Sequence, residues 1–96
     1  MNEQRYYTIE IVSQRVGLAP TIVRRYTRLG LVAPRAWHGD APLYGDADLA
    51  RLRKIARLTR DLGLNLAGVE VALRLTDELD LLRRQLASSH KEDLDL

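Results

Sequence analysis

The chain has 96 residues and no cysteine, and its 15 lysines and arginines stand against 13 aspartates and glutamates. The length suits one small domain, and the lack of cysteine excludes disulfides and thiolate metal sites and suits a reducing compartment. No apolar run approaches the roughly 20 residues of a membrane span, and the first residues lack the apolar stretch of a signal peptide. We therefore expect a cytoplasmic protein that makes no contact with a membrane.

The net charge of +2 is unevenly distributed along the chain. Up to residue 60 there are eleven basic and five acidic side chains, whereas from residue 61 onward four basic side chains face eight acidic ones. A basic first part favours contact with a polyanion such as nucleic acid. The alternative interpretation is that the arginines simply cover solvated helix faces.

The first predicted helix covers residues 9–16. Thr8 precedes it and is a good N-cap residue. Its inner stripe has apolar residues at spacings of three and four, namely Ile9, Val12 and Val16. Gly17 is expected to end this helix, because glycine adopts a positive φ without steric cost.

The second predicted helix covers residues 20–29, between Pro20, which suits a first helical turn, and Gly30. Three residues at helical spacing are expected to face the core: Ile22, Tyr26 and Leu29. Three arginines project mostly the other way: Arg24, Arg25 and Arg28. Two short helices joined by a tight turn are typical of a helix-turn-helix, in which the second helix enters a DNA groove.

A small β-hairpin, or wing, is predicted next. Residues 31–32 and 43–44 are expected to form its two strands, and turn-forming residues separate them. Trp37 and His38 would then lie near its tip.

Two more helices follow. The third begins near Asp46 and keeps its apolar period through Leu62 until Gly63. The fourth begins after Asn65, a good N-cap, and is expected to end near residue 88, with a disordered tail over 89–96. Its heptad-like row predicts a dimer interface, and consists of Ala72, Leu75, Leu79, Leu82 and Leu86.

This order of elements resembles the DNA-binding domain of the MerR family. The matching segments are residues 7–9, 17–20, 23–35, 43–44, 48–52 and 62–64. The resemblance implies a mostly α, winged helix-turn-helix domain over residues 1–75 with a two-stranded wing. A longer dimerisation helix over residues 65–88 would continue into a short coiled-coil-like segment.

The resemblance also implies the partners and the contact residues. A homodimer would bind double-stranded DNA at an inverted-repeat operator, with the second helix at the phosphates and groove edges. The candidate DNA-binding residues are Arg24, Arg25, Tyr26, Arg28, Arg35, Tyr44 and Arg53. Core packing explains Tyr26 equally well. The wing departs from DNA-binding relatives, which usually carry an arginine just before the wing tyrosine, because Pro42 and Leu43 precede Tyr44 here.

The stretch from Asp61 to Glu70 resembles a chaperone-linked branch of the family. That branch includes heat-shock repressors of the HspR type, which bind operators in front of chaperone genes. It also includes chaperone modulators of the CbpM type, which bind the J-domain of a DnaJ-like co-chaperone and need not bind DNA. The first interpretation predicts a transcriptional regulator, and the second remains the alternative. Acidic residues on the fourth helix would suit a basic J-domain, although a solvated helix face is the simpler interpretation of them: Asp77, Glu78 and Asp80.

Enzyme chemistry has little support in the sequence. His38 and His90 lie too far apart and too differently placed to indicate a metal site, and no glycine-rich phosphate loop precedes a helix. We expect a regulator without a metal or another cofactor.

Overall fold

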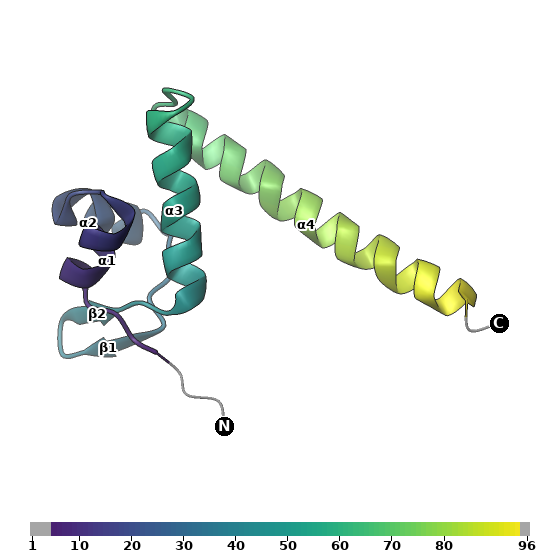
Figure 1. The fold of residues 1–96 in the computed structure, drawn as a ribbon, viewed down its shortest axis with the longest axis horizontal. Coiled ribbons are helices and arrows are strands. Elements are labelled where there is room, and N and C mark those ends of the chain that lie inside the picture. Colours follow the sequence, from purple (N-terminus) through teal and green to yellow (C-terminus); the bar gives the residue numbers. More distant parts are fainter. Residues whose placement is uncertain (1–4, 95–96) are drawn as a thin grey trace. The chain divides into compact units, whose positions relative to one another are not determined.

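The computed structural model describes residues 5–94, with side chains described up to residue 89. The chain divides into two compact units, residues 1–64 and 65–96. The first unit holds α1 (Ile9–Val16), α2 (Pro20–Arg28), β1 (Ala36–His38), β2 (Ala41–Leu43) and α3 (Asp46–Arg60), and the second holds α4 (Leu66–Leu94) (Figure 1). The boundary between the units therefore falls at the start of α4, whereas the sequence extends the winged domain to residue 75.

The helix-turn-helix begins and ends at the residues that favour caps. The N–H of Ile11 donates to Thr8 Oγ1 at 3.4 Å at the start of α1. Gly17 ends α1 with a φ of 73° and donates its N–H to the Ser13 carbonyl. Pro20 occupies the first turn of α2, which ends at Arg28 with Leu29 as its C-cap. The predicted bounds of both helices are confirmed to within one residue.

The buried face of α2 differs from the prediction. Val23 and Tyr26 are its buried residues, whereas Ile22 is half-buried. Leu29, the C-cap residue of α2, is 47 % exposed. The expected stripe through Leu29 is therefore wrong, and Val23 fills the place in the core.

The wing is a two-stranded antiparallel hairpin that begins later than predicted. Trp37 lies opposite Pro42 in the register of β1 and β2. Residues 31–32 are not a strand, and Val32 is buried in the core instead. Tyr44 lies just beyond β2 and pairs with Tyr7 through two backbone hydrogen bonds of 2.8 Å.

The core of the first unit is built around α1 and α3. α1 contacts both α2 and α3. The Gly45 N–H donates to Asp48 Oδ2 at 2.9 Å and caps α3. Leu62, beyond the end of α3, is 67 % exposed, so the inner stripe ends earlier than the sequence predicts. The buried apolar residues of this unit are Tyr7, Ile9, Val12, Val16, Val23, Tyr26, Val32, Tyr44, Leu49, Leu52, Ile55 and Ala56.

The last helix begins as predicted and continues further. The Gly68 N–H donates to Asn65 Oδ1 at 2.9 Å, which confirms Asn65 as a cap. α4 continues to Leu94, so the expected disorder from residue 89 is wrong up to that residue, and residues 95–96 lie outside the described part. The helix continues because no glycine or proline occurs between residues 69 and 94.

One face of α4 carries exposed leucines. Leu75, Leu79, Leu82 and Leu86 are 59, 44, 60 and 72 % exposed, whereas Val69 and Leu73 are buried. Ala72, the first member of the predicted row, is half-buried. Within the described residues, no helix is both long and apolar enough to cross a membrane.

Candidate nucleic-acid interface

The outer face of α2 is basic and open to solvent. Arg24, Arg25 and Arg28 are all exposed on this helix, whose nine residues contain no acidic side chain. Their direction follows from the burial of Val23 and Tyr26 on the other face. The helix therefore presents three guanidinium groups, which can bind phosphates or, in bidentate fashion, the edge of guanine.

A groove of about 330 Å³ lies between α2 and the wing. Arg24, Thr27 and Arg28 line it from α2, and Trp37, Asp40 and Pro42 line it from the wing. The wing side is therefore aromatic and apolar, with one carboxylate from Asp40. The structure brings three predicted contact residues to this groove: Arg24, Arg28 and Tyr44.

Tyr44 is the most deeply buried of the residues that line this groove. It is fully buried, and its hydroxyl lies 2.8 Å from Thr27 Oγ1. The Thr27 hydroxyl donates its single proton to the Val23 carbonyl at 2.8 Å, so Tyr44 is the donor in the pair. Burial raises the pKa of the Tyr44 hydroxyl above its usual value. The burial of Tyr44 and its bond to Thr27 favour a structural role, in which this side chain joins the base of the wing to α2, over the predicted DNA contact.

Tyr26 is also buried, with 7 % of its surface exposed. Its place on the inner face of α2 next to buried Val23 favours core packing, the alternative that the sequence left open. Its neighbours Arg24, Arg25 and Arg28 carry the exposed chemistry of the helix.

Arg35 lies outside the α2–wing groove. Its Cδ is 2.9 Å from the position that a Cβ on Gly45 would occupy, so its stem lies along the start of α3. It borders another hollow together with Tyr6 and Asp48. The two strands of the wing contain no lysine or arginine, so Arg35 does not replace the missing wing cation in the groove.

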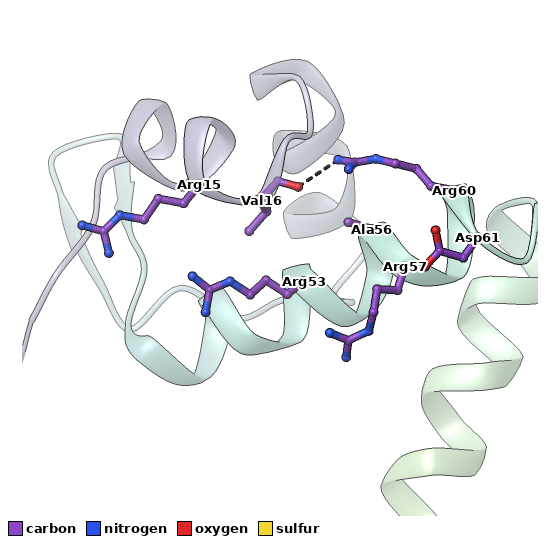
Figure 2. A pocket seen from close by; sticks show the side chains of 7 residues that line it. All are labelled: Arg15, Val16, Arg53, Ala56, Arg57, Arg60 and Asp61. Atoms are coloured by element: carbon purple, nitrogen blue, oxygen red, sulfur yellow. Dashed lines mark hydrogen bonds between the residues drawn. The ribbon is translucent and has the colours of Figure 1, made fainter.

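Arg53 belongs to a second basic surface. It lines a cleft between α1 and α3 with three other arginines, Arg15, Arg57 and Arg60, and shares no lining residue with the α2–wing groove (Figure 2). We call it the α1–α3 cleft. The sequence analysis missed these three partners, although the four-residue spacing of Arg53 and Arg57 places both on one side of a helix.

No metal site is visible in the part of the chain that the structure describes. Within it, no group of three or more histidine, aspartate or glutamate side chains is arranged to hold a metal ion. The arrangement offers cationic side chains on a helix and beside a cleft, and this suits recognition of an anionic partner.

Comparisons with known proteins agree with this geometry. The sequence profile of MerR HTH family regulatory proteins matches residues 7–91. A Streptomyces coelicolor protein, provisionally named heat shock protein HspR, is 36 % identical over 81 residues, which are 84 % of this chain and 54 % of that protein. The chain thus spans about half the length of this curated relative.

Proposed function

Because the chain belongs to the MerR family of helix-turn-helix regulatory proteins, we propose that it is a sequence-specific DNA-binding transcriptional regulator of heat-shock or chaperone genes. The observation that carries the proposal is the set of three exposed arginines on α2. The opposite face of this helix packs in the core through Val23 and Tyr26. The heat-shock assignment is supported by the 36 % identity to the protein named heat shock protein HspR.

In this proposal α2 lies in the major groove of DNA. Arg24, Arg25 and Arg28 bind base edges and neighbouring phosphates, since a guanidinium matches the acceptors of guanine and of phosphate. The bond between Tyr44 and Thr27 fixes the wing beside α2, so the groove between them keeps its width.

A homodimer would read two half-sites. The exposed leucines of α4, Leu75, Leu79, Leu82 and Leu86, form a row that a second copy can bury. Two-fold pairing of two α2 helices matches an inverted-repeat operator.

Selection of bound fragments from a randomised DNA pool, followed by calorimetric titration with the selected operator, tests the proposal. The variant Arg24→Ala/Arg28→Ala is expected to lose binding, whereas Arg74→Ala/Arg84→Ala removes the same charge from exposed positions of α4 off the leucine row and should retain it. Equally weak binding of the wild type to every sequence would refute the sequence-specific function.

A second candidate function is favoured by the chemistry of the wing. Trp37 is 57 % exposed and lies beside Pro42 and Asp40 on the wing side of the groove, and an exposed aromatic side chain of this kind suits a protein partner. The protein would then be a chaperone modulator that binds the J-domain of a co-chaperone. Titration of the cell's own J-domain tests this candidate, which predicts heat of binding that persists in Arg24→Ala/Arg28→Ala. No heat with the wild type would exclude it.

A further inference from the structure

The turn that leads into α2 contains backbone carbonyls that need a donor from elsewhere. The last carbonyls of a helix have no partner within it, and Pro20, four residues after Val16, has no N–H to donate. Arg60, the last residue of α3, supplies the donor. Its Nη2 donates to the Val16 carbonyl at 2.8 Å, as Figure 2 shows, and also to the Gly17 carbonyl. The segment before α2 is therefore tied to α3.

The glycine at position 17 leaves room for this contact. A Cβ on Gly17 would lie 2.5 Å from Arg60 Nη2, which is closer than a Cβ atom tolerates. The guanidinium also lies at the C-terminal end of α1, where the helix dipole favours a positive charge. The missing side chain at position 17 and the dipole of α1 thus both favour a guanidinium group at this place.

The segment that follows α2 is tied to α3 in a similar way. Gly30 has a φ of 78°, and its N–H donates to the Thr27 carbonyl at 3.1 Å. The Leu31 N–H donates to the Tyr26 carbonyl at 3.0 Å, which completes a Schellman cap at the end of α2. The carbonyl of the same Leu31 accepts a hydrogen bond from Nε of Arg51 on α3. One residue thus joins the last turn of α2 to α3.

The two attachments are spaced like the ends of α2. Arg51 and Arg60 are nine residues apart on α3, which is about 13 Å along a helix axis, and the nine residues of α2 have about the same length. A helix that is held at one end can pivot about that point, whereas two points fix its direction. The exposed arginines of α2 depend on this direction, because a binding site must hold its contact groups to within about 0.5 Å.

We propose that Arg51 and Arg60 are positioning residues for DNA recognition. Through the carbonyls on either side of α2 they set the direction of this helix, and thereby the sequence preference, without touching a base themselves. The inference rests on the function proposed for α2 and adds two residues that the sequence did not single out. Contacts to phosphates are independent of sequence, whereas base contacts set the preference. The loss of a positioning residue should therefore appear in the preference.

The test measures a ratio of affinities, that for the selected operator divided by that for a fragment of the same length and scrambled sequence. Arg51→Gln and Arg60→Gln each remove one attachment, and each should lower the ratio. The loss of one bidentate base contact corresponds to a fall of roughly 5- to 150-fold. Arg57→Gln is the matched control, because Arg57 is exposed on the last turn of α3 and points away from Val16 in Figure 2. It should keep the wild-type ratio, since a phosphate contact contributes equally to both fragments.

A purely structural role gives a different result, provided that circular dichroism shows each variant to be folded at the temperature of the titration. An unchanged ratio in either folded variant, whatever its melting temperature, would overturn the proposal. If a glutamine variant does not fold, the lysine variant of that position replaces it, since lysine keeps the charge but places no N–H where Nε or Nη2 donates. A wild type that binds both fragments equally refutes the function proposed for α2 and this inference with it. A wild type that discriminates, with variants that do so equally well, refutes the inference alone.

Discussion

Replacement of Tyr44 by phenylalanine tests whether this residue joins the wing to α2 or contacts DNA. The change removes one hydroxyl that donates to Thr27 Oγ1 at 2.8 Å and leaves the fully buried ring in place. Thr27 keeps its own bond to the Val23 carbonyl, so no buried donor loses its partner. The expected effect is therefore that of one hydrogen bond, without a cavity or an orphaned group.

The magnitude follows from that single bond. A net intramolecular hydrogen bond contributes about 1 kcal/mol to the free energy of unfolding. For a domain of this size, 1 kcal/mol corresponds to a fall in Tm of roughly 4–8 °C. Tyr44→Ala should cost about 3–5 kcal/mol, because it also removes a large buried side chain.

A double-mutant cycle with Thr27→Val isolates the pair. Urea unfolding of the two single variants and the double variant should give a coupling free energy of about 0.5–1 kcal/mol. Thr59→Val is a matched control, because the Thr59 hydroxyl also bonds back to helix carbonyls at 3.0 Å, and its coupling to Tyr44→Phe should be zero.

A measurement of DNA affinity decides whether the Tyr44 hydroxyl acts on Thr27 or on DNA. At a temperature well below the melting transition, Tyr44→Phe should bind the operator like the wild type, since the groove keeps its shape. A variant of unchanged stability that has lost DNA affinity would refute the reasoning, because the hydroxyl would then act on the ligand rather than on Thr27.

Three further outcomes are expected. The pKa of Tyr44 lies above its usual 10.0, so the unfolded chain loses the hydroxyl proton at a lower pH than the folded chain does. The free energy of unfolding, measured with urea, should therefore fall as the pH rises through about 10. Tyr44→Phe should remove this contribution to the pH dependence. Gly17→Ala should lower the free energy of unfolding, measured in thermal melts, by more than Gly30→Ala does. Both positions have a positive φ, which costs alanine about 1–2 kcal/mol, but only at Gly17 would the new Cβ lie 2.5 Å from Arg60 Nη2. Leu79→Asp should give a monomer in light scattering, because burying an unpaired charge at the α4 interface costs several kcal/mol, and a persisting dimer would place the interface elsewhere.

The helix ends were predictable because their signals are local. Thr8, Pro20 and Asn65 act within the next turn of their own helices, and Gly17 acts through its own φ. The first strand was not predictable in the same way. Whether residues 31–32 or 36–38 pair with the second strand depends on the partner across the hairpin, which no local pattern in the sequence identifies.

The sequence predicted which residue types form the candidate site, but not which of their side chains are exposed. The arginines of α2 are exposed as expected, because burial of the apolar face of this helix turns the opposite, basic face toward solvent. The family resemblance named Tyr44 as a contact residue, but it could not show that the tyrosine ring is fully buried in this chain. Arg53 was assigned to the correct helix, but its grouping with Arg15 depends on how α1 packs against α3.

The composition of the wing gives the protein a built-in optical reporter. Trp37 is the only tryptophan of the chain, it is 57 % exposed, and it lines the same groove as Arg24 and Arg28. Indole emission shifts when water around the ring is replaced, so the intrinsic fluorescence of the unlabelled protein follows occupancy of this groove. Trp37 does not line the α1–α3 cleft, so a ligand confined to that cleft should leave the emission unchanged. One spectrum can thereby separate the two surfaces during a single titration.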